Sequence, residues 1–141
     1  METLCRLQSL FASNRQFAAG ERGERLAADH LIGMGYAVLA RNWRNPRDNR
    51  DEIDLVCRDG MVLVFVEVKA RTERAVVPGY HAVDGRKKRV LRRAVRSYLG
   101  LLHRKPRTYR LDIVEVTFGA GPPAIRHYEN IPLFYHRQPR L

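Results

Sequence analysis

The chain has 141 residues, with 26 Lys or Arg against 15 Asp or Glu, so its formal net charge is +11. This length suits one domain, and a 45% hydrophobic content is enough for an ordinary packed core. No secretion signal, membrane-spanning run, zinc motif or disulfide framework is recognisable, which predicts a reducing, cytoplasmic setting. The basic balance predicts a polyanionic partner, nucleic acid before an anionic membrane surface, although an Arg-rich proteome would produce the same imbalance.

Two helices are predicted before the first strand. Apolar residues recur at helical spacing in segment 2–13 and more strongly in segment 17–34, which two glycines end. Glu24 falls on or beside the inward face of the second helix, an unusual place for a carboxylate without a task.

Three β-type runs follow, at 36–41, 52–57 and 61–70. The polar segment 44–51 between the first two contains Pro and Asn and is predicted to be a loop. The third run, MVLVFVEVKA, is almost entirely β-branched or aromatic, which is typical of a central strand buried on both faces. Asp59-Gly60 before it predicts a hairpin turn.

The second half of the chain alternates helix and strand. Segment 71–83 is predicted to be a loop, and segment 85–102 is an amphipathic helix with an apolar stripe and many Arg and Lys. Strands are expected at 109–118 and near 124–129. This order predicts a small α/β fold with a mixed central sheet flanked by helices.

The domain division follows from these elements. We assign 1–15 to an N-terminal helical extension, 16–131 to a single domain and 132–141 to a loose basic tail.

Two carboxylates and a lysine are expected to converge on the sheet. Side chains alternate across a strand, so Glu67 and Lys69 lie on one face. If Asp59-Gly60 form the turn, Asp54 pairs with Phe65 and joins that face, diagonal to Glu67. A loop of three residues would break this arrangement.

These residue types suit a divalent metal ion. The carboxylates of Asp54 and Glu67 would repel each other without a cation, and Mg²⁺ (or Mn²⁺) takes one or two carboxylates together with water and phosphate oxygens. The carbonyl of Val68 is a further expected ligand. Lys69 would position or deprotonate the attacking water, and Glu24 would bind the metal through water. The bland alternative is an exposed Glu-Lys salt bridge, but an apolar strand and a basic helix beside it favour a site.

The motif resembles a known class of enzyme. Asp54 followed by Glu67-Val68-Lys69 resembles the D…ExK signature of the PD-(D/E)XK nuclease superfamily. The strings GERGERLAADHL, EIDLV, VFVEVKAR, VDGRKKRVLRRAVRSYL and RLDIVEV are similar to the YraN family, bacterial proteins predicted to be Holliday-junction-resolvase-like endonucleases. The resemblance spans about residues 16–118. It departs from the superfamily at Ile53, which stands where the proline of the PD motif would be, and from the family in a longer loop 45–51.

The resemblance implies a restriction-endonuclease-like fold and magnesium-dependent cleavage of DNA, with branched DNA cut by a homodimer that presents two sites. It implies catalytic positions at Asp54, Glu67 and Lys69, and the helix carboxylate at Glu24. Lys87 matches the lysine that opens the second helix, although a lysine that caps the helix and reaches to solvent is equally expected.

Three further assignments stay open at this level. The basic helix is expected to bind nucleic acid through Arg86, Lys87, Lys88, Arg89 and Arg93, unless these residues only form a solvated face. Asp112 corresponds to an aspartate of the family's fourth strand, and we favour a buried hydrogen-bonded acid over a catalytic one. Glu52 is either a further acid at the edge of the site or an exposed strand start.

Two functions compete with the nuclease. One is a non-catalytic nucleic-acid-binding module that keeps the nuclease fold, and the other is a basic adaptor protein in which the acidic residues form a salt bridge. An intact D…ExK set argues against the binding module, because a pure binder has no need for two carboxylates near phosphates.

Overall fold

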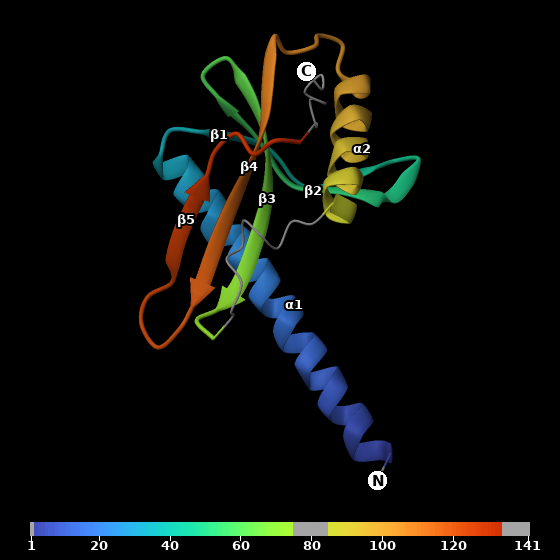
Figure 1. The fold of residues 1–141 in the computed structure, drawn as a ribbon, viewed down its shortest axis with the longest axis vertical. Helices are drawn as coiled ribbons and strands as arrows, with labels where there is room; N and C mark the ends of the chain where they lie inside the picture. The colour runs from blue at the N-terminus through green and yellow to red at the C-terminus, as the bar shows by residue number, and fades with distance from the viewer. Residues whose placement is uncertain (1, 75–84, 134–141) are drawn as a thin grey trace, which may run out of the picture.

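Five strands form one mixed sheet in the order β1-β2-β3-β4-β5 in the computed structural model, with helices on both faces (Figure 1). The structure describes residues 2–74 and 85–133, with side chains from residue 17 onward. The elements are α1 (Glu2–Gly33), β1 (Ala37–Asn45), β2 (Asp48–Asp59), β3 (Val62–Thr72), α2 (Gly85–Leu101), β4 (Thr108–Phe118) and β5 (Ala124–Tyr128). The predicted order of the five strands, the helix between the third and fourth of them, and the mixed sheet are confirmed. In the described part of the chain, no helix has both the length and the apolarity needed to cross a membrane.

β3 is the centre of the sheet, as its apolar run predicts. It pairs antiparallel with β2 and parallel with β4, and α2 lies in the connection that a parallel pair requires. Val64 and Val66 belong to one core with α1, whereas Leu63 and Phe65 belong to another with α2. Because successive side chains point to opposite faces, the two helices cover opposite faces of the sheet.

A single helix, α1, replaces the two helices predicted at 2–13 and 17–34. Residues 14–16 contain neither Gly nor Pro, so nothing in the backbone interrupts the helix between them. Its end is a Schellman motif: Gly35 has φ +94°, its N–H donates to the carbonyl of Ile32, and the N–H of Tyr36 donates to that of Leu31. The domain division made from the sequence stays a prediction.

The hairpin between β1 and β2 corrects the prediction of a loop at 44–51. β1 extends to Asn45 and β2 begins at Asp48, so only a tight turn separates the strands. Close to its turn, this hairpin is fixed by tertiary contacts that the local polar composition does not reveal. The buried carboxylate of Asp51 accepts hydrogen bonds from Asn45 and from Arg93 of α2, and Asn45 also donates to Ser97 of α2.

The turn between β2 and β3 also differs from the prediction. Asp59 pairs with Val62, so Gly60 and Met61 form the turn instead of Asp59-Gly60. Gly60 has φ +56° at the first turn position, where a type II′ turn requires glycine. The register therefore shifts by two residues, and Val56 rather than Asp54 pairs with Phe65. A shift of two keeps the side chains from Leu55 to Asp59 on their expected faces.

Candidate functional site

The pairing of β2 with β3 runs from the turn at Gly60 back to Leu55 and does not include Asp54. The last pair is Leu55 with Val66, and one further step would bring Asp54 level with Glu67. Instead, the carboxylate of Asp54 accepts a hydrogen bond from the backbone N–H of Val68, with 2.7 Å between Oδ2 and N. Ile53 faces the α2 core and Leu55 the α1 core, so the alternation of β2 is broken at Asp54. The side chain of Asp54 thus lies against the edge of β3.

Glu67 is the buried carboxylate of the site, with 2% of its surface exposed. Its Oε1 lies 2.8 Å from Nζ of Lys69 and 3.2 Å from Nζ of Lys87, at the start of α2. Its Oε2 is buried and has no hydrogen-bond partner among the described residues. One oxygen therefore meets two cations while the other meets none. We call Asp54, Glu67, Lys69 and Lys87 the Asp54–Glu67 cluster.

Repulsion between carboxylates shapes the protonation of this cluster. Burial, and then the charge of Glu67, raise the pKa of Asp54 from 3.8 to about 7, against the hydrogen bond from Val68. Burial acts to lower the pKa of Lys87, but the adjacent Glu67 outweighs it and the pKa is raised. Near neutral pH, the cluster therefore combines a charged lysine with an aspartate that gains or loses its proton.

Glu24 of α1 reaches toward the same carboxylates from the other face of the sheet. Burial raises its pKa, as do the charges of Glu52, Glu21 and Glu67, whereas a hydrogen bond with Asn42 lowers it. The helix approaches closely here because Gly23 has no side chain. A Cβ at that position would lie 2.9 Å from Cβ of Ala70 in β3.

Asn42 is a site residue that the sequence analysis missed. It has φ +48°, in the left-handed region, and lies between the pairs Arg41–Leu55 and Trp43–Ile53, opposite Asp54. Both strands of the hairpin are therefore irregular at the same level. The available signal is an Asn within a β-type segment, since Asn tolerates positive φ better than most residues.

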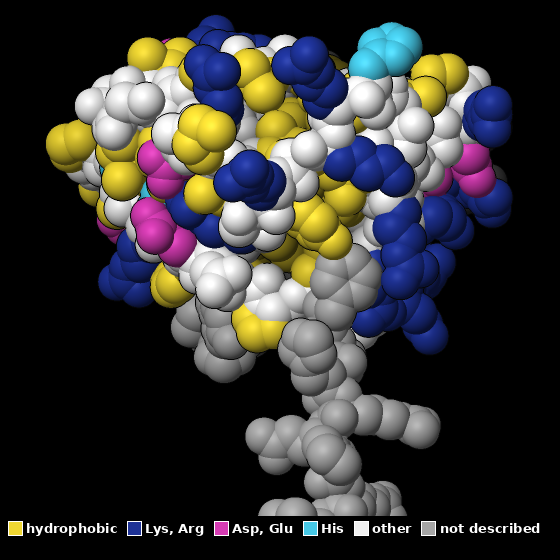
Figure 2. Space-filling view, turned by 90° about the horizontal axis from the view of Figure 1, so that it is seen from above, with side chains coloured by type: hydrophobic (Ala, Val, Ile, Leu, Met, Phe, Trp, Pro, Cys, Tyr) yellow, Lys and Arg dark blue, Asp and Glu magenta, His cyan; other side chains and the backbone are white. Residues whose placement is uncertain are grey.

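Some basic residues of α2 pair with buried carboxylates, and others face solvent. Lys87 contacts Glu67, Arg86 and Arg89 are exposed, and Lys88 is half-buried. Arg93 instead pairs with the buried carboxylate of Asp51, with half of its side chain exposed. Figure 2 shows Lys and Arg side chains gathered on the right-hand side of the molecule, where α2 and the β1–β2 hairpin lie in Figure 1.

Asp112 takes part in a separate polar network. Its carboxylate is fully buried and accepts hydrogen bonds from Arg110 and from the backbone N–H of Asn130, and it contacts the ring of His127. These bonds lower its pKa despite the opposing effect of burial. Asp112 is thus a buried, hydrogen-bonded acid, and the choice between a structural and a catalytic role stays a prediction. Glu52 is half-buried and pairs with Arg44 at 3.3 Å.

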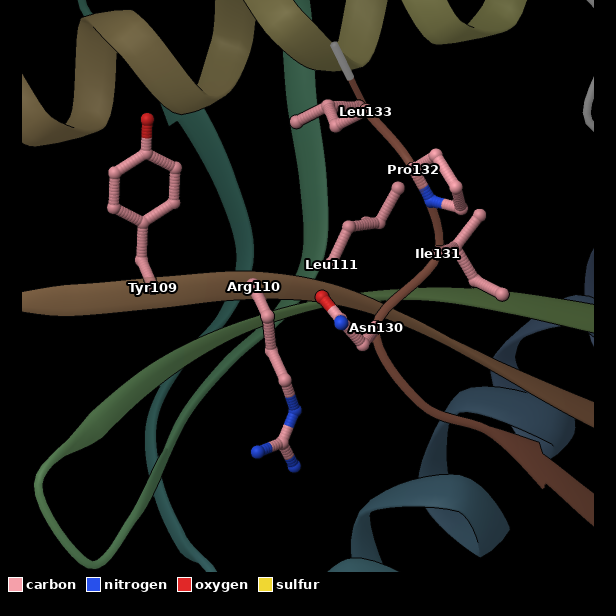
Figure 3. A pocket seen from close by; sticks show the side chains of 7 residues that line it. All are labelled: Tyr109, Arg110, Leu111, Asn130, Ile131, Pro132 and Leu133. Carbon is pink, nitrogen blue, oxygen red and sulfur yellow. The ribbon is translucent and has the colours of Figure 1, made fainter. Parts of the chain in front are cut away.

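Two pockets of the described surface are lined by residues outside the Asp54–Glu67 cluster. A pocket of about 420 Å³ lies beside the start of β4, lined by Tyr109, Arg110, Leu111, Asn130, Ile131, Pro132 and Leu133 (Figure 3). None of the candidate residues lines it, and the side chain of Arg110 points away from the apolar ones. A pocket of about 270 Å³ has both Glu24 and Asn42 in its wall.

The donor set fits a hydrated hard cation better than an enclosed one. Within residues 2–74 and 85–133, no three His, Cys, Asp or Glu side chains gather closely enough to hold a metal alone. Asp54 and Glu67 offer two carboxylates, and Mg²⁺ typically needs only one or two together with water and phosphate oxygens. The Oε2 of Glu67 has no hydrogen-bond partner among the described residues, and burial and the charge of Glu67 raise the pKa of Asp54, so a cation between the two carboxylates would stabilise both.

Comparison with known proteins identifies the family. The chain is 44% identical over 112 residues to a UPF0102 protein of Anaeromyxobacter dehalogenans, covering 79% of this chain and 81% of the relative. It is 45% identical over 100 residues to a UPF0102 protein of Symbiobacterium thermophilum, covering 71% and 82%. The model of the Uncharacterised protein family UPF0102 matches residues 23–116, which include Glu24, Asp54, Glu67, Lys69 and Lys87. The chain therefore belongs to the UPF0102 family, in agreement with the YraN-like resemblance of its motifs.

Proposed function

We propose that this protein is an Mg²⁺- or Mn²⁺-dependent endonuclease that hydrolyses phosphodiester bonds of DNA on a restriction-endonuclease-like fold. One observation carries the proposal: a buried glutamate with an unpartnered oxygen lies beside a second carboxylate whose pKa is raised to about 7. A salt bridge alone does not account for this arrangement, because the two lysines at Glu67 share its other oxygen. The D…ExK pattern supports the same conclusion.

The carboxylates of Asp54 and Glu67, with the carbonyl of Val68, would hold the metal. When bound, such an ion polarises the scissile phosphate and lowers the pKa of a water molecule. The hydrogen bond from the N–H of Val68 fixes the carboxylate of Asp54 against β3. Burial of Glu67 limits its rotation, so neither ligand depends on a flexible loop.

The lysines supply positive charge where negative charge develops. Lys69 is held beside Glu67 and would position the attacking water or stabilise the phosphate in the transition state. Lys87 remains protonated near neutral pH because its pKa is raised, and it would bind a phosphate oxygen of the substrate. Glu24, held by Asn42, would bind water at the rim. Branched DNA as the substrate, and a homodimer that cuts it, rest on the family resemblance.

The test compares wild type with Asp54→Asn and Glu67→Gln on branched, duplex and single-stranded DNA, with Mg²⁺, Mn²⁺ or EDTA. We expect wild type alone to cut, and only with a divalent metal. Asp29→Asn, an exposed change on α1, is the matched control and should cut like wild type. If wild type binds DNA but cuts nothing in either metal, the non-catalytic binding module is favoured. If it neither binds nor cuts at low salt, the adaptor function is favoured.

A further inference from the structure

We infer that the β1–β2 hairpin enters the major groove of B-form DNA while α2 lies against the phosphate backbone, so that duplex DNA is the substrate class. The choice of DNA rests on the proposed function. The placement of the hairpin rests on its geometry, its anchoring and its lack of stacking residues.

The end of the hairpin is a two-stranded ribbon that projects from the sheet. β2 has no pairing with β3 before Leu55, and Asp48, Glu52 and Ile53 pair with β1 alone, with a register shift between Arg44 and Asn45. In Figure 1 the ribbon extends past α2, away from the rest of the sheet. Two strands lie about 4.8 Å apart, and the major groove of B-DNA, about 12 Å wide, admits such a ribbon.

Contacts with α2 hold the ribbon in one direction. Asp51 is 2% exposed and pairs with Arg93, which joins β2 to α2. The rings of Trp43 and Tyr98 meet edge to face with their centres 5.2 Å apart, which joins β1 to the same helix. A ribbon fixed to α2 can present both elements to one duplex without a large ordering cost.

α2 is strongly basic, whereas the β1–β2 hairpin is nearly neutral. α2 carries seven Lys or Arg and no acid, whereas segment 44–52 carries three Arg and three acids. The acids face Arg44, Arg50 and Arg93, which makes the ribbon itself nearly neutral. α2 would therefore supply the attraction to phosphates, and the exposed tip, with Arg47 and Asn49, would supply hydrogen-bond donors in the groove.

Single-stranded nucleic acid and duplex RNA fit this surface poorly. Segment 44–52 contains no aromatic residue, and Trp43 is packed against Tyr98, so no ring is free there for stacking on unpaired bases. The major groove of A-form RNA is too deep and narrow for side chains to read. B-form duplex DNA is the occupant that remains.

The test measures binding by fluorescence anisotropy in EDTA, so that no cleavage is required. The probes are duplex DNA, single-stranded DNA and duplex RNA of one sequence, with wild type, Arg47→Ala/Asn49→Ala and Arg104→Ala. Arg104 is exposed in the α2–β4 connection and gives the same change of charge. We expect wild type to bind duplex DNA most tightly. The hairpin variant should weaken that binding about tenfold, and the control about twofold at most.

Groove-specific competitors give a second, independent readout. Methyl green, a major-groove ligand, should displace wild type from duplex DNA, and netropsin, a minor-groove ligand, should not. The inference is overturned if single-stranded DNA or duplex RNA binds as tightly, if netropsin displaces the protein, or if both variants weaken binding equally. Absence of any binding at low salt overturns it too.

The two proposals can fail separately. Hairpin-dependent binding of duplex DNA without metal-dependent cleavage would refute the nuclease and keep the groove contact. If Asp54→Asn abolishes cleavage but the hairpin variant cuts like wild type, the groove contact is refuted and the nuclease is kept.

Discussion

Replacing Asp54 by asparagine should make the folded protein more stable, and more so as the pH rises. Burial and the charge of Glu67 raise the pKa of Asp54 from 3.8 to about 7. The folded state therefore binds this proton more tightly than the unfolded chain does. The free energy of unfolding falls as pH rises from about 4 to about 7, by about 4 kcal/mol at 1.36 kcal/mol per pK unit.

Asparagine removes this penalty and keeps the shape. Its side-chain oxygen can still accept the hydrogen bond from the N–H of Val68. We expect Asp54→Asn to raise the free energy of unfolding by about 4 kcal/mol at about pH 8, and by less than about 1 kcal/mol at about pH 4, where wild type is mostly protonated.

Urea unfolding at both pH values, followed by circular dichroism, measures the difference. Asp29→Asn on the exposed side of α1 is the control and should change stability little at either pH. The electrostatic argument is refuted if Asp54→Asn is no more stable than wild type at the higher pH, or gains equally at both. Such a gain would accompany loss of cleavage, the expected trade-off at a functional carboxylate.

Two further predictions concern packing. Gly23→Ala places a Cβ 2.9 Å from that of Ala70, so it should lower the free energy of unfolding by about 1 kcal/mol net, despite better helix propensity. A Cβ at Gly20 would meet nothing within 4 Å, so Gly20→Ala should raise the free energy of unfolding by up to about 1 kcal/mol. Urea unfolding measures both variants, and a change of the same sign in both would contradict the close contact at Gly23. The buried thiol of Cys57, whose pKa burial raises to about 11, should react with a thiol reagent only after unfolding in a Cys5→Ser background. Rapid labelling of the native variant would show that this core is open.

Local periodicity was sufficient to predict part of the site. Glu67 and Lys69 share a face because the strand repeat of two is a property of the backbone, and their 2.8 Å contact follows from it. The wrong turn shifted the register by only two residues, so Asp54 stayed near Glu67 although the alternation of β2 is broken at Asp54 itself. The Asp-Gly pair favoured a type I′ turn, whereas the structure uses the positive φ of Gly60 one position earlier in the turn.

The remaining parts of the site depend on contacts between distant segments. Asn42 forms a hydrogen bond with Glu24 of α1, which approaches the sheet at Gly23, and no pattern within β1 encodes that approach. The polar segment 44–51 suggested a loop because composition does not show that Asp51 is buried against Arg93 of α2. The tertiary contact of the buried Asp51 with Arg93 overrides the local preference.

The separation of β2 from β3 at Asp54 has a consequence for the whole domain. Elsewhere the sheet separates the hydrophobic core that contacts α1 from the core that contacts α2, so charges on opposite faces of the sheet lie far apart. At Asp54 this separation is interrupted. The charge of Glu24, on the α1 side, raises the pKa of Asp54, and the charge of Lys87, on the α2 side, lowers it. Evolution of either layer is therefore constrained by the other, because a repacking that shifts one helix changes the electrostatic environment felt across the sheet.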